Sequence, residues 1–304
     1  MKKIKINAKS APIIEQILSK VNAGFKNIEI QLIHEFVSDT EYKDVKKAIE
    51  KYGIDIAVVH TPLIVIPEEN VSQEVSLDYI LIDKYYDIFC DTCKYSQYIA
   101  KIEGHRVKIV IHNNSSKEDW KRTNLIEEKI GPRIKKVLDK YEDIDLVIEN
   151  STIYNINRFN SIFDMEDVSF VVKELNRIIG NRSKTLVDTC HMMINWEAWR
   201  RVTYTKLVDW DDAFYKSTIY EKLGLIHLNN IKDNGISYEY HGTEFDKNIK
   251  SDLATLKQIM NAYEKYADCE ITIEVREDDY KGVPKNLITT KEALENLGYE
   301  LDLG

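Results

Sequence analysis

Short runs of apolar and β-branched residues alternate with longer segments of helical period along the whole chain. Strands are expected at eight places: Ile4–Asn7, Ile28–Leu32, Ile56–His60, Val107–His112, Leu146–Glu149, Thr185–Asp188, Leu225–Leu228 and Ile271–Glu274. Because these strands are short and almost wholly apolar, both faces of their sheet must be covered. We therefore predict a single (β/α)8 barrel of parallel strands, with its active site at the C-terminal face of the strands.

The segments between the strands carry apolar residues at spacings of three and four, which is typical of amphipathic helices. Such segments cover residues 13–21, 77–89, 126–141, 168–179, 253–263 and 293–297. A doubly wound open sheet is the alternative, but the first strand is not followed by a glycine-rich nucleotide-binding motif. No linker rich in proline, glycine or serine interrupts the pattern, so we expect one domain over residues 1–304.

The charge balance disfavours two kinds of partner. The chain has 42 Lys and Arg against 51 Asp and Glu, a net charge of −9, which repels nucleic acids and anionic membranes unless a local basic patch overrides it. It contains no apolar run of about eighteen residues, and its basic start is not followed by the apolar part of a signal peptide. We expect a cytoplasmic protein with no membrane partner.

The cysteines also fit a reducing compartment. Four cysteines are too few and too scattered for a disulfide framework in a chain of 304 residues. Cys90 and Cys93 form a Cys-x-x-Cys pair, but they lie in a segment of helical period and no second pair completes a zinc site. We expect both to be structural residues of a helix.

Side chains that bind metals stand at the ends of six predicted strands. They are His60, His112, Glu149, Asp188 with His191 three residues later, His227 and Glu274. A barrel brings the carboxyl ends of its strands together, although these residues are spread over more than half of the sequence. His241 follows a strand end in the same way, whereas His34 and His105 lie elsewhere and are expected to be structural.

Two glutamates close the apolar runs DLVIE and ITIE, which is costly unless each binds a cation or a strong donor. A pairing of Glu149 or Glu274 with Arg276, or a helix-capping role, is the structural alternative. Together with Asp188 and His227, these glutamates form a Glu-Asp-His-Glu set suited to Mn²⁺, Co²⁺, Mg²⁺ or Zn²⁺. We predict a divalent metal site made by these four residues.

The motifs in their order resemble the endonuclease IV and xylose-isomerase-like superfamily of metal-dependent TIM barrels, which includes sugar and sugar-phosphate isomerases and epimerases. The resemblance covers essentially the whole chain. It is carried by His60-Thr61-Pro62, Glu149-Asn150, Asp188-Thr189-Cys190-His191, His227-Leu228-Asn229-Asn230, His241-Gly242 and Glu274.

Two activities follow from this resemblance. In the isomerase and epimerase branch, the four-residue set would hold one ion, and Glu149 and Glu274 would be catalytic, passing a proton at the carbon beside a carbonyl. In the endonuclease branch, three zinc ions would cleave a phosphodiester at an apurinic or apyrimidinic site. Their further ligands would correspond to His60, His112, His191, Glu239 and His241, with Glu239 in place of an expected aspartate.

The net charge and the acidic, arginine-free segment after the second strand favour a small sugar or sugar phosphate over DNA. In that interpretation His191 and His241 orient substrate hydroxyls. A barrel that only binds a partner is a third possibility, but it would be expected to lose metal ligands. The long insertion after the sixth strand holds Trp196, Trp199 and Arg200, which form either a lid over the substrate or a packing surface on the barrel rim or on a second subunit of a homo-oligomer.

Overall fold

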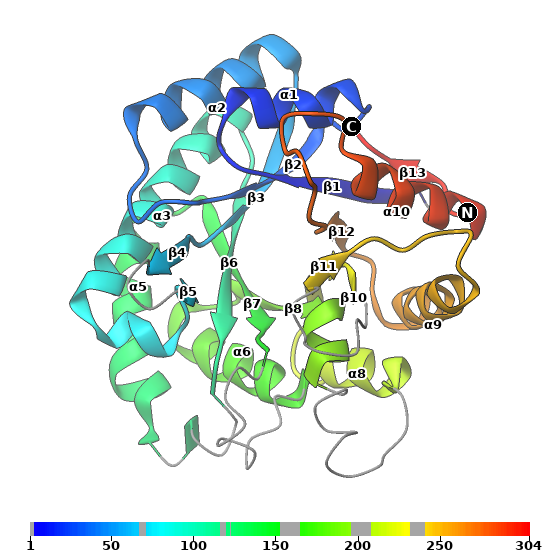
Figure 1. The fold of residues 1–304 in the computed structure, drawn as a ribbon. Coiled ribbons are helices and arrows are strands. Elements are labelled where there is room, and N and C mark those ends of the chain that lie inside the picture. Colours follow the sequence, from blue (N-terminus) through cyan, green and yellow to red (C-terminus); the bar gives the residue numbers. More distant parts are fainter. Residues whose placement is uncertain are drawn as a thin grey trace.

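Eight parallel strands form a closed barrel in a computed structural model (Figure 1). The structure describes residues 3–66, 71–115, 120–121, 123–152, 165–195, 208–231 and 241–304. The barrel strands are β1 (Ile4–Ser10), β2 (Asn27–Gln31), β3 (Asp55–His60), β6 (Val107–Asn113), β7 (Ile144–Asn150), β8 (Ser183–Asp188), β9 (Leu223–Leu228) and β12 (Glu270–Ile273). Each strand pairs in parallel with the next one, and β12 pairs with β1 to close the sheet. The predicted fold and all eight predicted strand positions are confirmed.

Helices surround this barrel (Figure 1). They are α1 (Ile14–Asn22), α2 (Asp39–Tyr52), α3 (Asp83–Glu103), α5 (Gly131–Lys140), α6 (Met165–Ile179), α8 (Trp210–Ser217), α9 (Lys250–Tyr266) and α10 (Lys285–Asn296). Their ends follow local sequence signals, as α2 illustrates. Ser38 and Glu41 form a reciprocal capping box at its start, and Gly53 ends it at φ 63, a left-handed conformation that favours glycine.

Two predicted helices are interrupted in the structure. In the 77–89 segment, a 3₁₀ turn at Asp78–Leu81 is followed by extended backbone at Ile82, and α3 begins only at Asp83. In the 126–141 segment, a π-helical turn at Ile126–Ile130 precedes α5. Pro132 has no N–H to donate at this junction, so a regular α-helical ladder cannot run through it.

Inward-facing residues form layers along the barrel, because side chains alternate between the two faces of a strand. The middle layer contains a separate cluster of five buried aliphatic residues: Val58, Val110, Val147, Leu186 and Leu225. Each stands two positions before one of the polar residues that end these strands, so both sets face the interior. The larger core lies between the barrel and its helices.

Three additional pairings were not predicted. The hairpin of β4 (Leu63–Ile66) and β5 (Val71–Glu74) follows β3, and that of β10 (Asn230–Ile231) and β11 (His241–Thr243) follows β9. The short β13 (Leu301–Asp302) pairs with the amino end of β1. Both hairpins lie after the carboxyl end of a barrel strand, the end where active sites of such barrels are built.

Cys90 and Cys93 lie on α3 as free thiols, half-buried and buried respectively, as the structural interpretation predicts. Burial raises the pKa of the Cys93 thiol well above its ordinary value. Within the described ranges, no helix is both long enough and apolar enough to cross a membrane.

Candidate metal centre

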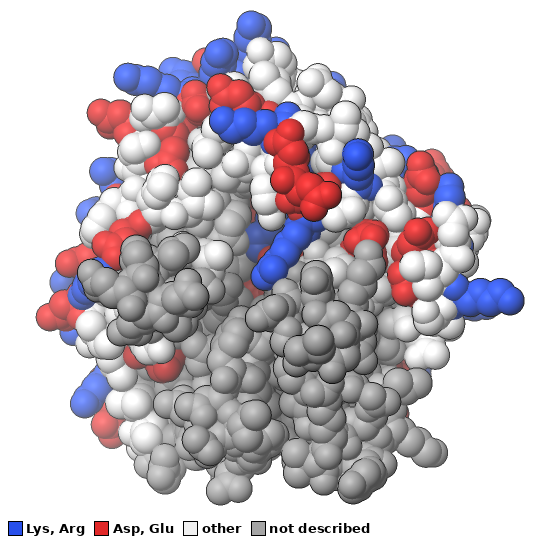
Figure 2. Space-filling view, viewed as in Figure 1, with Lys and Arg blue, Asp and Glu red and all other residues white. Residues whose placement is uncertain are grey.

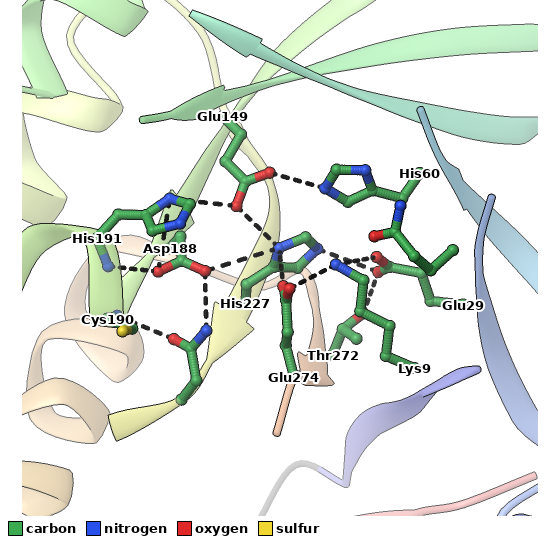
Figure 3. Close-up of polar contacts among 12 residues, drawn as sticks. Lys9, Glu29, His60, Glu149, Asp188, Cys190, His191, His227, Thr272 and Glu274 are labelled. Carbon is green, nitrogen blue, oxygen red and sulfur yellow. Dashed lines mark hydrogen bonds and ion pairs between the residues drawn. The ribbon is translucent and has the colours of Figure 1, made fainter. Parts of the chain in front are cut away.

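The polar residues at the strand ends converge inside the carboxyl end of the barrel (Figure 3). Among the described residues, His60, His112 and Glu149 form one group of possible ligands. A second group consists of Glu149, Asp188, His227 and Glu274. In each group, one ligand atom per residue lies within 4.8 Å of all the others. Glu149 belongs to both groups.

Strand register explains why residues far apart in the chain meet here. His112 on β6 is the direct cross-strand neighbour of Glu149 on β7, and Asp188 on β8 is that of His227 on β9. Direct neighbours on one face of a sheet bring their side chains within contact distance. The barrel closes these pairs around one interior space.

In the first group, two imidazoles face the same oxygen of Glu149. The Nε2 atoms of His60 and His112 lie 3.2 and 3.1 Å from its Oε2. His60 Nδ1 lies 2.8 Å from the Thr61 carbonyl oxygen, which can only accept, so Nδ1 carries the proton. In neutral His60 the lone pair of Nε2 therefore faces a carboxylate oxygen. This arrangement calls for a cation between the two atoms.

In the second group, His227 stands among three carboxylates. Its Nδ1 lies 3.0 Å from Glu149 Oε1, 2.6 Å from Glu274 Oε2 and 3.9 Å from Asp188 Oδ2. Glu274 Oε2 is buried and accepts no hydrogen bond from the described residues, although it lies this close to the imidazole. A buried carboxylate oxygen in this position is suited to a bound cation.

The same contacts shift the ionisation of the site. Burial opposes the ionisation of Glu149, but the imidazoles of His112 and His227 outweigh it and hold the pKa of Glu149 well below its ordinary value. Burial also opposes a charge on His227, yet the surrounding glutamates raise its pKa well above its ordinary value. Burial raises the pKa of Asp188 to about 6, against the effect of nearby His191.

Asparagines hold Asp188 in place. The side-chain amide of Asn229 donates to Asp188 Oδ2 at 2.9 Å. The backbone N–H of Asp188 donates to Asn150 Oδ1 at 2.8 Å. His191 donates its backbone N–H to Asp188 Oδ1 at 2.6 Å, and its Nδ1 donates to the Asn150 carbonyl oxygen, also at 2.6 Å. Asn150 and Asn229 thus fix a proposed ligand from both sides.

Two charged residues of this network were not predicted from the sequence. Lys9 on β1 lies 2.6 Å from Glu274 Oε1 and 3.7 Å from Glu29 Oε1. Glu29 on β2 is completely buried and contacts His227 Nε2 at 3.1 Å. A charged residue inside the short strand NIEIQ is the signal that could have indicated Glu29. Lys9 lies beyond the end that was predicted for the first strand.

The donor set fits divalent metal ions. Imidazole nitrogens with carboxylate oxygens suit Zn²⁺, Mn²⁺ and Co²⁺, and the group rich in carboxylates also suits Mg²⁺. Within the described residues, Glu29, Glu149, Asp188 and Glu274 share this space with Lys9, which leaves an excess of negative charge when the imidazoles are neutral. The buried His, Glu and Asp groups therefore make a divalent metal site the best explanation of this end of the barrel.

Other predicted site residues are only partly covered by the structure. The backbone of His241 pairs with Ile231 in the β10–β11 hairpin, but its side chain lies outside what the structure describes. Glu239, Trp196, Trp199 and Arg200 also lie outside the described residues. Their predicted roles stay predictions.

The two histidines with structural interpretations lie away from this centre. His34 is exposed, and His105 Nε2 contacts Asp55 Oδ1 at 2.7 Å. Asp55 begins β3, at the opposite end of the barrel from His60. Asp55 is thus a partner of His105 there, and together with Glu103 the two residues form a more exposed group of possible ligands.

Charges of both signs are mixed on the described part of the face shown in Figure 2. Lysine and arginine side chains stand beside aspartate and glutamate, and neither sign covers the visible described surface. The net charge of −9 is therefore not a uniform negative field over this face.

Comparison with known proteins places the chain in a family. The model of the xylose isomerase-like TIM barrel family matches residues 21–297. None of the curated proteins compared with the sequence is similar enough to count as a relative.

Solved structures share this fold at low sequence identity. A xylose isomerase-like TIM barrel protein from Mycobacterium smegmatis in complex with magnesium has a TM-score of 0.56 and 11% identity, over 97% of this chain and 99% of its own. SacUVDE has a TM-score of 0.55 and 14% identity, over 97% and 99%. A sugar phosphate isomerase/epimerase from Parabacteroides distasonis has a TM-score of 0.50 and 12% identity, over 97% and 94%. At these identities, the similarities to solved structures show the fold alone. The family model matches residues 21–297, so the chain belongs to the xylose isomerase-like TIM barrel family.

Proposed function

We propose that this protein is a divalent-metal-dependent phosphodiester hydrolase of the endonuclease IV-like type. One observation carries the proposal: the two oxygens of Glu149 face two different groups of ligands. Oε2 faces His60 and His112, whereas Oε1 faces His227. A carboxylate in this position is suited to bridge two metal ions, and an enzyme with a single ion would not need the first group.

Each group has its own role in this proposal. His60 and His112 would hold one ion with Glu149, while Asp188, His227 and Glu274 would hold the second with the other oxygen of Glu149. When bound, such ions supply Lewis-acid stabilisation of a phosphoryl oxygen and lower the pKa of water so that it can act as a nucleophile. A third zinc, for which the family resemblance implies His191, Glu239 and His241, stays a prediction.

The charge of the site supports an anionic substrate. Counting the described residues with neutral imidazoles, Lys9 offsets one of the four carboxylates, so one divalent ion would leave the interior negative and two would leave it positive. A positive interior attracts a phosphodiester. The overall charge of −9 acts from further away and is screened over about 8 Å at physiological salt, so it weighs less than the local charge.

A sugar or sugar-phosphate isomerase or epimerase is the second candidate. The group of Glu149, Asp188, His227 and Glu274 could hold a single ion without the other histidines, which supports this function. Proton transfer by two glutamates requires that each keeps one oxygen free. Lys9 lies 2.6 Å from the outer oxygen of Glu274, which lowers the basicity of that oxygen and makes this role less favourable.

The test compares both reactions on the metal-loaded protein. We expect cleavage of duplex DNA with one abasic site, and no solvent deuterium in a panel of ketoses, ketose phosphates and inosose-like polyols. His60→Asn removes a proposed ligand and should lower cleavage by more than the roughly 100-fold that loss of an outer partner of a ligand can cause. His105→Asn, a histidine substitution at the opposite end of the barrel, should leave it unchanged. Deuterium incorporation without DNA cleavage would replace this proposal by the isomerase.

A further inference from the structure

Glu29 is a buried carboxylate that neither proposed reaction uses. Its side chain is 0% exposed, on strand β2 in the interior of the barrel. Its Oε2 accepts a hydrogen bond from Thr272 Oγ1 at 2.7 Å and lies 3.1 Å from His227 Nε2 (Figure 3). A fully buried charge is costly, so these contacts require an explanation.

The contact with Glu29 determines which nitrogen of His227 can bind a metal. An ionised carboxylate can only accept, so Nε2 must carry a proton to form this hydrogen bond. The other nitrogen, Nδ1, faces Glu149 and Glu274 at 3.0 and 2.6 Å. With its proton on Nε2, neutral His227 presents the lone pair of Nδ1 to the metal centre.

Lys9 connects this contact to a second proposed ligand. It is the cross-strand neighbour of Glu29, and its Nζ lies 3.7 Å from Glu29 Oε1 and 2.6 Å from Glu274 Oε1. The remaining oxygen of Glu274, Oε2, faces His227. Lys9 therefore holds the outer oxygen of Glu274 and leaves one oxygen directed toward the metal centre.

We propose that Glu29 is a positioning residue that selects Nδ1 of His227 as the metal-binding atom. Lys9 is the cation that keeps Glu29 and Glu274 in this arrangement. Outer partners of metal-binding histidines commonly act in this way and change metal affinity by about 10–100-fold. The inference rests on the metal centre of the proposed function, but not on the reaction that this centre catalyses.

The test is a titration of the metal-stripped protein with Co²⁺ alone, followed by visible absorption. The neutral amide that Glu29→Gln introduces is a weaker acceptor than a carboxylate, and it can also turn its NH2 toward Nε2 of His227. That orientation favours the tautomer with the proton on Nδ1, which cannot bind a metal through Nδ1. Glu29→Gln should therefore bind Co²⁺ about 10–100-fold more weakly and change the absorption spectrum. Glu270→Gln is the matched control, because Glu270 is a buried glutamate paired with Lys108 at the other end of the barrel. It should keep the wild-type affinity and spectrum.

Two further substitutions separate positioning from a loss of folding. Glu29→Asp keeps the charge but draws the carboxylate back by one methylene, and it should also weaken Co²⁺ binding. Lys9→Met should change the Co²⁺ spectrum, because the released Oε1 of Glu274 can then bind the ion as well, whereas Lys9→Arg should keep the wild-type spectrum. Circular dichroism would establish that each variant is folded.

The outcomes distinguish this inference from the proposed function. Wild-type Co²⁺ affinity and spectrum in a folded Glu29→Gln or Glu29→Asp protein would overturn the inference, even if the wild type cleaves abasic-site DNA. Weakened Co²⁺ binding in both variants would support it, even if the wild type cleaves no phosphodiester.

Discussion

The two ends of the barrel interior are both charged, but they are balanced differently. At the amino end, Lys5 lies 2.7 Å from Asp55, and Lys108 pairs with Glu270. At the carboxyl end, Glu29, Glu149, Asp188 and Glu274 lie together, and in the described part of the chain Lys9 contacts two of them, Glu29 and Glu274. Strand β6 contributes a residue to each end, with Lys108 at the amino end and His112 at the carboxyl end.

We interpret this difference as that between a structural layer and a candidate metal-binding layer. A carboxylate with a lysine partner needs nothing else to remain buried. Among the described residues, the carboxylates at the other end have Lys9 as their lysine partner, and they also contact the imidazoles of His60, His112 and His227. Lys5 and Lys108 thus pair with carboxylates at the amino end, whereas among the described residues of the carboxyl end the carboxylates outnumber the lysine that contacts them, which suits divalent ions.

Glu149→Ala should have the largest effect, because it removes the residue shared by both ligand groups. We expect loss of bound metal and of activity by more than the roughly 100-fold that outer partners of a ligand can cause. Elemental analysis of the purified variant measures this loss. Full metal content in Glu149→Ala would show that the carboxyl end is not the metal site.

Metal should stabilise the protein through the carboxyl end only. A divalent ion that binds only the folded state adds about 2.7 kcal/mol at a concentration 100 times its Kd. Thermal unfolding with and without chelator should show this shift in the wild type and in Lys108→Met, but not in Glu149→Ala. An equal shift in Glu149→Ala would place the ion elsewhere.

Lys108→Met should destabilise the amino end and leave the metal centre intact. It removes the partner of buried Glu270, but Lys5 at 3.6 Å and Asn7 at 3.2 Å remain beside that carboxylate. We therefore expect a loss of about 1–3 kcal/mol in the free energy of unfolding, measured with urea. Loss of bound metal in this variant would mean that the two ends are not independent.

The free energy of unfolding of the metal-free protein should depend on pH through the buried carboxylate of Asp188. The folded-state pKa of Asp188 is about 6, above its ordinary value of 3.8, mainly because of burial. The stability that this group contributes is therefore complete below about pH 4 and lost as the pH rises through about 6. Urea unfolding across this range should show the loss in wild type relative to Asp188→Asn. Saturating metal should oppose it, because an ion binds the ionised carboxylate.

The Cys90→Ala, Cys93→Ala double variant should have the smallest effect on function. Both thiols lie on α3, outside the barrel interior, and Cys93 is fully buried. We expect a loss of about 1–3 kcal/mol in stability from the emptied volume and an unchanged metal content. Release of metal from this variant would contradict the structural role of the two cysteines.

The fold and the site were predictable from the sequence to different extents. Eight apolar runs predicted the eight barrel strands, because burial on both faces leaves a continuous hydrophobic signal. The ends of those runs predicted residues whose side chains lie together in the two groups of possible metal ligands. Pairing inside the barrel was not predictable, because the contact of Glu29 with His227 joins β2 to β9 and depends on how the sheet closes.

Local irregularities were missed for a different reason. The apolar spacing of residues 77–89 and 126–141 continues through a 3₁₀ turn and a π-helical turn, since the same residues still face the core. Periodicity records which face is buried, not the hydrogen bonds of each turn. In the second segment, Pro132 was the sequence signal that could have indicated the interruption.

We propose that Glu149 would be a ligand of two metal ions, and the count of tightly bound ions per chain tests this proposal most directly. Elemental analysis should find at least two ions in the wild type. The double variant His60→Asn, His112→Asn should lose about one ion. It should keep the ion that Asp188, His227 and Glu274 would hold. One ion in the wild type, unchanged in the double variant, would contradict the bridged centre and leave a single-ion site.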